Sequence, residues 1–246
     1  CPTMRIHPGI IAQAAATAAA MMPGRFVLGL GSGENLNEHI FGDRWPPAPV
    51  RIEMLEEAVE VIRALWTGSM QTYYGSFYTL ENAQVFSLPE SLPPIAIASE
   101  GPISASLAAR VGDGFINGGT NAEESLVVFK KSGGDDKPAY VEISVCWAES
   151  EEVGERTAYE EWPIAANTGE INRLLPTPAH YEQLAKMATL EDVVEGMPCG
   201  PDPEPYIKKI EDRVRMGFDH ICIHQIGEQQ KEFMDFAAAE ILPHFR

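Results

Sequence analysis

The apolar positions of this chain form two patterns that alternate along its length. Short runs without polar interruption, at 26–30, 93–99 and 220–225, predict strands buried on both faces, as in a parallel sheet. Longer segments such as 50–67 repeat apolar residues at every third or fourth position and predict amphipathic helices. This alternation indicates a parallel α/β protein, in which we count five β/α units.

Further elements follow from the same patterns and from glycine and proline breaks. A hairpin is expected at 71–80, strands at 115–117 and 140–147, and helices at 8–22, 101–111, 121–131, 150–161, 202–217 and 228–245. Residues 163–201 interrupt the alternation with proline, glycine and short helical pieces, and they predict an insertion that caps one end. We expect 1–246 to be a single domain that contains this insertion.

Two of these helices carry expectations for individual side chains. In helix 50–67 the apolar residues share one face, and four glutamates occupy another, which predicts a solvated face. These are Glu53, Glu56, Glu57 and Glu60. In helix 202–217 the apolar residues Ile207, Ile210 and Val214 recur at helical spacing and are expected to face inward.

The charge balance limits the partners of this protein. Its 246 residues include 36 acidic and 18 basic side chains, a net charge of −18, which argues against nucleic acid or an anionic membrane as a partner. No apolar run reaches the length of a membrane-spanning helix. The four cysteines lie far apart, without a C-x-x-C pair, as is typical of reduced thiols. We therefore expect a cytoplasmic protein whose partner is neither nucleic acid nor a membrane.

A glycine-rich stretch follows the first apolar run. Three glycines at alternate positions precede a carboxylate and two amides in Gly29-Leu-Gly-Ser-Gly-Glu-Asn-Leu-Asn37. Polar groups at the carboxyl end of a buried parallel strand are where barrels and open α/β sheets place their chemistry. The spacing is not that of a dinucleotide fingerprint, and no Lys-Ser/Thr follows to make a P-loop. From the glycines alone, a tight turn after a core strand is an equal alternative.

The segment from Gly29 to Glu38 resembles the signature of the luciferase-like flavin and deazaflavin oxidoreductases, and within them the F420-dependent glucose-6-phosphate dehydrogenase branch. Further matches occur in the same order at Cys1-Pro2-Thr3, Pro23-Gly24-Arg25, Gly101-Pro102, Gly112-Asp-Gly114 and Gly217-Phe-Asp-His220. The resemblance implies an α/β fold, a (β/α)8 TIM barrel truncated to about its last five units plus an insertion. Roughly 70–80 residues of such a barrel would precede Cys1, and in the family they carry a catalytic histidine and aspartate.

The resemblance also implies a cofactor, coenzyme F420, with FMN as the alternative. Glu34 matches the family glutamate that protonates the deazaflavin ring, a role that requires burial to raise its pKa. Ser32, Gly33 and Asn37 match contacts to the cofactor. The alternatives are a surface acid for Glu34 and a turn or capping residue for Asn37.

A second group of cofactor contacts is implied at the end of run 93–99. Ser99 and Gly101 match positions near the anionic side chain of the cofactor, and Gly101 opens a helix whose free N–H groups suit a phosphate. Glu100 departs from the small residue that is usual in the family, and an outward-facing acid is the simplest interpretation.

The substrate is less constrained. The bases that clamp a sugar phosphate in the branch are missing from loop 118–121, and Lys231 is followed by Glu232, so a neutral alcohol or carbonyl compound is favoured. Trp147, His224 and Gln225 stand at strand ends and are candidates for the substrate pocket, although a lone histidine on a barrel strand is more often a hydrogen-bonded core residue. No residues show metal-ligand spacing.

The combined hypothesis is an F420-dependent oxidoreductase that transfers a hydride to or from a small organic substrate, with a homodimer as the expected assembly. Three alternatives remain: an F420-dependent glucose-6-phosphate dehydrogenase, an FMN-dependent monooxygenase of the same fold, and a non-catalytic truncated paralogue. The last follows from the missing strands, since an open barrel exposes sheet edges and apolar surface that another chain must cover.

Overall fold

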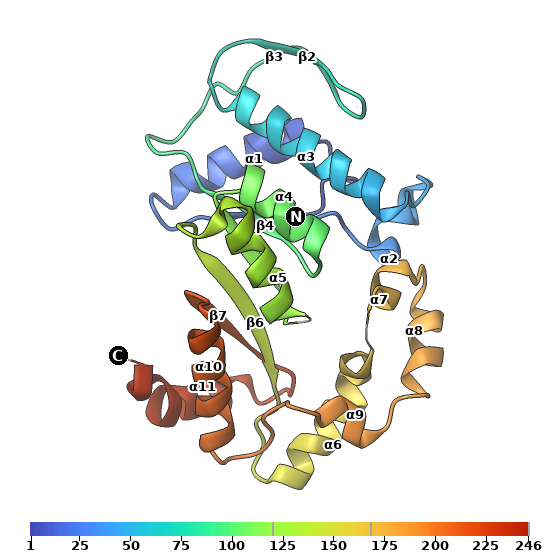
Figure 1. Ribbon diagram of the computed structural model, residues 1–246, viewed down its shortest axis with the longest axis vertical. Coiled ribbons are helices and arrows are strands. Elements are labelled where there is room, and N and C mark those ends of the chain that lie inside the picture. The colour runs from blue at the N-terminus through green and yellow to red at the C-terminus, as the bar shows by residue number, and fades with distance from the viewer. Residues whose placement is uncertain (120, 168, 246) are drawn as a thin grey trace. The chain divides into compact units, whose positions relative to one another are not determined.

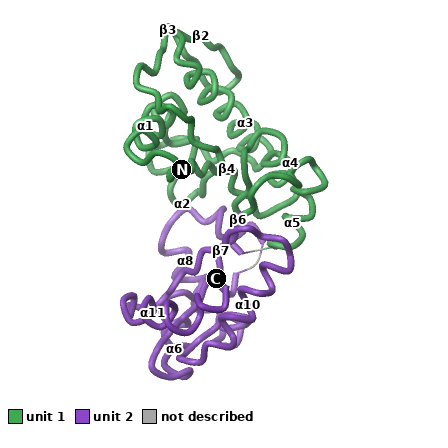
Figure 2. Tube along the Cα trace, turned by 90° about the vertical axis from the view of Figure 1, so that its left-hand side faces the viewer, with its two compact units in different colours: residues 1–117, 121–139 green, residues 118–120, 140–246 purple. Residues whose placement is uncertain are grey.

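The computed structural model of the protein describes residues 1–119, 121–167 and 169–245 (Figure 1). The chain divides into two compact units, which Figure 2 shows in different colours. Unit 1 comprises Cys1–Asn117 and Asn121–Ala139, and unit 2 comprises Gly118–Thr120 and Tyr140–Arg246. Of the loop 118–121, Thr120 lies outside the described residues, as does Thr168 of the expected insertion.

Unit 1 contains three parallel strands, a hairpin and helices. Its elements are α1 (Pro8–Met21), β1 (Leu28–Leu30), α2 (Asn35–Glu38), η1 (His39–Phe41), α3 (Ala48–Leu65), β2 (Gln71–Tyr74), β3 (Thr79–Ala83), β4 (Ile95–Ala98), α4 (Pro102–Val111), β5 (Gly114–Asn117), α5 (Ala122–Phe129) and η2 (Lys130–Gly134). β1 pairs in parallel with β4, where Leu28 lies opposite Ile95, and β4 pairs in parallel with β5, where Ala96 lies opposite Gly114. The strands and helices expected in this part of the sequence are therefore confirmed.

The parallel strands of unit 1, β1, β4 and β5, are largely buried, as their uninterrupted apolar sequences predict. Leu30, Ile95, Ile97 and Phe115 have no exposed surface. Helix α3 buries an apolar stripe that includes Leu55, Ala58 and Ile62, and helix α1 packs against α3.

The expected hairpin forms from β2 and β3, and it covers part of the glutamate face of α3 that we expected to be solvated. The hairpin lies over α3 (Figure 1). Glu57 accepts three successive backbone N–H groups of residues 76–78 at 2.7–3.0 Å. Glu60 accepts from the Tyr73 hydroxyl at 2.9 Å, and Glu56 pairs with an arginine of α4. The solvated-face prediction holds for Glu53 and Glu60, whose side chains are exposed, but Glu57 binds the hairpin turn, which has more N–H donors than its own backbone satisfies.

The longer segment of unit 2 begins within the strand β6, whose first residue, Ala139, belongs to unit 1, and it ends with three helical segments. Its elements are β6 (Ala139–Val145), α6 (Glu151–Glu161), η3 (Pro163–Ala166), α7 (Ile171–Leu174), α8 (Pro178–Ala185), α9 (Leu190–Val194), α10 (Glu204–Met216), β7 (His220–Gln225), α11 (Gln230–Phe236), η4 (Ala237–Ile241) and η5 (Leu242–Phe245). β6 and β7 pair in parallel, from Tyr140 opposite His220 to Val145 opposite Gln225. The short helices between 163 and 201 agree with the pieces expected there, and their capping role stays a prediction.

The core of unit 2 forms where α10 and α11 cover β6. Ile143 and Val145 pack there with Tyr206, Ile207 and other apolar side chains. Val214 is 51% exposed, so its expected inward orientation was wrong. The buried stripe of α10 lies within its first two turns, and the core cluster does not reach the last turn. In the described part of the chain, no helix is both long enough and apolar enough to cross a membrane.

Candidate functional site

The glycine-rich loop is held at the carboxyl end of β1 by pairing with the first residues of the chain. The N–H of Gly31 donates to the Cys1 carbonyl at 3.1 Å, and the N–H of Thr3 donates to the Gly31 carbonyl at 3.4 Å. Pro2 and Gly31 thus form a parallel bridge. The loop therefore leaves the sheet at a defined point, between the segment 1–3 and strand β4.

Gly33 turns the chain from β1 into α2. Its φ of +77° lies in the left-handed region, which suits glycine because a Cβ atom would crowd the backbone. Glu34 follows in extended conformation and precedes α2, where its carbonyl accepts the N–H groups of Asn37 and Glu38 at 3.0 Å. The Asn37 side-chain amide lies 3.4 Å from Oε2 of Glu34. The structure therefore brings together Ser32, Gly33, Glu34 and Asn37.

Glu34 does not have the burial that its expected acid role requires. Its side chain and that of Asn37 are exposed in the described chain. A flat ring laid over this loop would remove water from Glu34, whereas the protein atoms of unit 1 do not. Without a cofactor, the exposed Glu34 therefore agrees with the alternative given above, an acid on the protein surface.

A second carboxyl of the same loop, Glu38, was not identified from the sequence. Its side chain is only 5% exposed, and burial raises its pKa, against the opposing effects of Arg5 and of the backbone N–H groups of Glu34 and Arg5. Oε2 of Glu38 has no hydrogen-bond partner among the described residues. The glycine at position 33 is the sequence feature that goes with this arrangement. In the structure, a Cβ atom at Gly33 would lie 2.7 Å from Cγ of Glu38.

Ser99 and Gly101 lie at the end of the neighbouring strand β4. The Ser99 hydroxyl interacts with the Gly101 carbonyl at 3.1 Å and the Ser104 hydroxyl at 2.8 Å, so it is occupied in closing the turn before α4. Gly101 precedes α4, and no atom lies within 4 Å of the point where its Cβ would stand. The start of this ten-residue helix is therefore open, and its first N–H groups and dipole suit an anion such as a phosphate.

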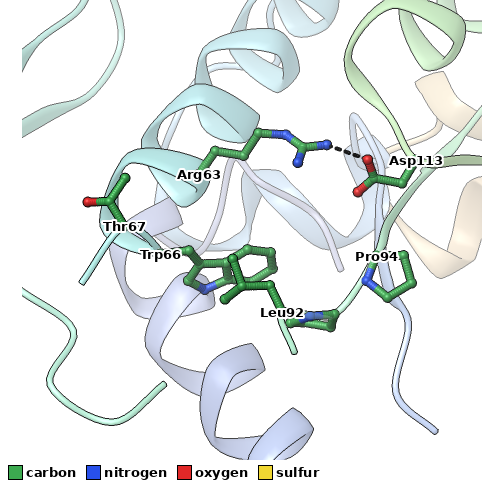
Figure 3. Close-up of a pocket in the computed structure, with 7 residues that line it drawn as sticks. Arg63, Trp66, Thr67, Leu92, Pro94 and Asp113 are labelled. Carbon is green, nitrogen blue, oxygen red and sulfur yellow. Dashed lines mark hydrogen bonds and ion pairs between the residues drawn. The ribbon is translucent and has the colours of Figure 1, made fainter. Parts of the chain in front are cut away.

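The cavity drawn in Figure 3 belongs to the opposite end of the same strands. It has a volume of about 490 Å³ and is lined by Arg63, Trp66, Thr67, Leu92, Pro93, Pro94 and Asp113. Pro94 precedes β4 and Asp113 precedes β5, whereas the candidate cofactor residues follow β1 and β4. An ion pair of 2.9 Å joins Arg63 to Asp113 at this end. This cavity is therefore separate from the candidate site.

In unit 2 the structure brings two of the three predicted pocket residues together. Oε1 of Gln225 accepts from the N–H of Trp147 at 2.8 Å, and its Nε2 donates to the Trp147 carbonyl at 3.1 Å. His224 is directed to other groups, with its ring edge-on to Trp162 at 5.1 Å and Nδ1 3.5 Å from Oε1 of Glu142. Consecutive residues of a strand point to opposite faces, so His224 does not share the face of Gln225. Within the described ranges, no three His, Cys, Asp or Glu side chains are placed to hold a metal ion.

Comparisons with known proteins agree with the signature. The family model described as luciferase-like monooxygenase matches residues 1–220. The F420-dependent glucose-6-phosphate dehydrogenase of Microbacterium testaceum (strain StLB037) is 35% identical over 257 residues, covering 100% of this chain and 76% of the relative. A protein of the same name from Mycobacterium avium (strain 104) is 32% identical over 259 residues, with the same coverage.

Solved structures give the same result for the fold. An F420-dependent secondary alcohol dehydrogenase in complex with an F420–acetone adduct has a TM-score of 0.90 at 26% identity, covering 100% of this chain and 77% of that one. The coenzyme F420-dependent tetrahydromethanopterin reductase of Methanopyrus kandleri has a TM-score of 0.80 at 18% identity, covering 100% of this chain and 81% of that one, and shares the fold. The chain spans about three quarters of the length of the curated relatives it matches. The luciferase-like barrel class predicted from the sequence is thus confirmed, and the chain belongs to the luciferase-like monooxygenase family.

Proposed function

We propose that this protein is an oxidoreductase that uses coenzyme F420 to transfer a hydride to or from a small alcohol or carbonyl compound. The observation that carries the proposal is the juxtaposition of the Gly31–Glu38 loop and the open start of α4 at the carboxyl ends of the adjacent parallel strands β1 and β4. The names of the curated relatives and of the F420-bound structural neighbour support the choice of cofactor.

The residues of unit 1 fit the two chemically different parts of such a cofactor. Ser32, the backbone at Gly33 and the Asn37 amide offer hydrogen-bonding groups to a polar ring edge. The open N-terminus at Gly101 offers N–H groups to a phosphate, without any lysine, in a chain of net charge −18. When bound, F420 supplies a deazaflavin ring that accepts or donates the hydride.

Glu34 is proposed as the acid that serves this ring. With the cofactor bound, the Glu34 carboxyl would hold a proton and supply it to the ring when a hydride is transferred to it. The Asn37 amide, 3.4 Å from Oε2 of Glu34, is proposed to hold the carboxyl in position. Coverage by the ring desolvates the exposed Glu34 and thereby favours its protonated form.

For the substrate we propose a neutral compound rather than a phosphorylated sugar. Of the described residues of loop 118–121, Gly118, Gly119 and Asn121, none is basic. The ammonium of Lys231 pairs with Asp235 one turn further on, at 2.6 Å. The structural neighbour that was solved with an acetone adduct acts on secondary alcohols by its name, whereas the curated relatives are named for glucose 6-phosphate. Trp147, with its backbone fixed by Gln225, is proposed to line the pocket, and His224 stays a weaker candidate.

The first test is a fluorescence titration of the purified chain with oxidised F420, with FMN as the control. Saturable binding of F420 alone is expected, and Glu34→Gln should bind F420 normally but reduce it at least tenfold more slowly with a secondary alcohol. Preferred oxidation of glucose 6-phosphate would overturn the substrate assignment. Binding of FMN with oxygen consumption would favour the monooxygenase, and binding of neither would favour the non-catalytic alternative. Cytoplasmic location and a homodimer stay predictions, and light scattering of the purified chain tests the latter.

A further inference from the structure

Unit 2 contains two cysteines that are distant in sequence but directly paired in the fold. Cys146 follows β6, and Cys199 stands near the end of the segment 163–201, where the chain returns to β6. The two residues form a parallel bridge. The N–H of Cys146 donates to the Pro198 carbonyl at 2.9 Å, and the N–H of Gly200 donates to the Cys146 carbonyl at 3.0 Å. These two hydrogen bonds bracket Cys199 and fix its register opposite Cys146.

This register suits a disulfide. Neighbouring strands lie about 4.7–4.9 Å apart, and residues paired across them have their side chains on the same face. The Cα atoms of disulfide-linked cysteines usually lie about 4.4–6.8 Å apart. Cys146 is fully buried in an apolar cluster with Ala158 of α6 and Val193 of α9, and Cys199 packs against the same cluster. Both are free thiols, so the structure shows the reduced form of a pair that needs little movement to join.

The two thiols differ in their access to solvent. Cys146 is buried, whereas Cys199 is only partly buried, so a small oxidant meets Cys199 first. Burial raises the pKa of both thiols, and it raises that of Cys199 to about 12 together with the charge of Cys146. Exchange is therefore slow at neutral pH, because the thiolate is the nucleophile, and it becomes faster as the pH rises. The other titratable groups that act on the pair are Glu151, Glu155, Lys209 and Tyr206.

We propose that Cys146 and Cys199 are a thiol–disulfide site that a low-molecular-weight disulfide oxidises reversibly. In the first step the Cys199 thiolate attacks one sulfur of the small disulfide, forms a mixed disulfide and releases one thiolate. The Cys146 thiolate then attacks the Cys199 sulfur and releases the second thiolate. Two protein S–H bonds break and one protein S–S bond forms, while the two electrons reduce the small disulfide to two thiols. A transient bond of this kind is compatible with the cytoplasmic location that we expect.

The cross-link acts on the insertion rather than on the proposed chemistry. The chain leaves β6 after Cys146, forms α6 and the short helices up to α9, and returns at Cys199. A disulfide that closes a loop of about 50 residues restricts the unfolded chain and stabilises the folded one. The redox state of this pair therefore controls how firmly the insertion is attached to the end of β6. This goes beyond the proposed function, whose cofactor residues lie in unit 1.

The first experiment equilibrates the chain with reduced and oxidised glutathione at pH 8.5. Cys1→Ser and Cys222→Ser are introduced beforehand, because both residues are exposed thiols outside the pair. Mass spectrometry after an acid quench should show the loss of two hydrogen atoms, and peptide mapping should find Cys146 joined to Cys199. In this background, Cys146→Ala should retain one glutathione on Cys199. Cys199→Ala should react at least tenfold more slowly, because the remaining thiol is buried.

A comparison of the folded and unfolded chain tests the register directly. At the same ratio of oxidised to reduced glutathione, the ratio of disulfide to dithiol should be at least tenfold higher in the folded chain than in concentrated urea. The oxidised chain should also unfold at a temperature higher by about 5 °C or more, and dithiothreitol should reverse this shift. The matched control is the variant with both Cys146→Ala and Cys199→Ala, in which glutathione should leave the midpoint unchanged. This comparison needs neither single alanine variant, so it stays decisive if Cys146→Ala does not fold.

Two results would overturn the proposal. A disulfide ratio in the folded chain that is equal to or lower than that in urea would show that the native register does not favour the bond. Glutathione that stays on Cys199 while Cys146 is present would show a single surface thiol instead of a pair. Neither result depends on F420 binding, since both cysteines lie in unit 2, so a failure here is distinguishable from a failure of the proposed function.

Discussion

The contact between Gly33 and Glu38 predicts a large and partly reversible effect of one methyl group. Gly33→Ala places a Cβ atom 2.7 Å from Cγ, 3.0 Å from Cδ and 3.1 Å from Oε1 of Glu38. Glu38 is buried, so its side chain does not swing into solvent to make room. The substitution therefore combines two costs, a left-handed backbone at a residue with a Cβ and an overpacked contact.

Both costs can be given a magnitude. The left-handed conformation costs roughly 1–2 kcal/mol for a residue with a Cβ, and overpacking a buried contact costs typically about 1–3 kcal/mol. Gly33→Ala should therefore lower the free energy of unfolding by about 2–5 kcal/mol. In a Glu38→Ala background the contact is gone, and Gly33→Ala should cost only the backbone part. The expected coupling energy of this double-mutant cycle is about 1–3 kcal/mol.

Urea unfolding followed by circular dichroism measures the four free energies of the cycle. Gly24 supplies a matched control, because its φ is +69° and no atom lies within 4 Å of the point where its Cβ would stand. Gly24→Ala should show the backbone cost without the contact. The reasoning fails if Gly33→Ala costs no more than Gly24→Ala, or if its cost is the same with and without the Glu38 side chain.

Three further predictions concern single side chains. Glu57→Gln should lower the free energy of unfolding by about 1–3 kcal/mol, because it weakens charge-assisted bonds to the hairpin turn, whereas exposed Glu53→Gln should change urea unfolding by less than about 0.5 kcal/mol. The raised pKa of Glu38 means that its contribution to stability is complete below the unfolded pKa of about 4.3 and is lost as pH rises through the folded pKa. Relative to Glu38→Gln, the wild type should therefore lose stability in urea titrations as the pH rises above the unfolded pKa of about 4.3, and a constant difference would contradict the burial argument. Gln225→Ala should cost about 1–3 kcal/mol in thermal unfolding, because it leaves the Trp147 backbone groups without their partner, and an unchanged midpoint would show that water replaces the amide.

The order of strands and helices could be predicted from the sequence because each buried strand is a short apolar run between helical repeats. The prediction was less successful for polar side chains on helix surfaces. Glu57 belongs to the polar face of α3 by its spacing, yet its partners, the N–H groups of residues 76–78, lie about twenty positions along the chain. Periodicity describes which face a residue occupies and contains no information about what later folds over that face.

In the candidate site, too, residues of one local turn could be predicted from the sequence, whereas contacts made by distant segments could not. Gly33, Glu34 and Asn37 are local to one turn, so the motif was enough to place them together. Glu38 was overlooked, although it belongs to the same stretch, because a glutamate in a first helical turn is ordinarily exposed and its burial depends on the segment around Arg5. His224 and Gln225 were grouped because both stand at the end of a strand, but consecutive residues of a strand point to opposite faces.

The exposure of Glu34 decides what the cofactor itself must contribute to the proposed chemistry. Unit 1 leaves Glu34 exposed, whereas burial raises the pKa of the neighbouring carboxyl Glu38. Two carboxyls four residues apart in one loop thus stand in opposite environments. If F420 binds here, its ring must bring Glu34 into an environment like that of Glu38, and the binding of F420 should then be accompanied by proton uptake that Glu34→Gln abolishes. Calorimetry in two buffers at pH 6 measures this uptake, and its persistence in Glu34→Gln would assign the proton to another group.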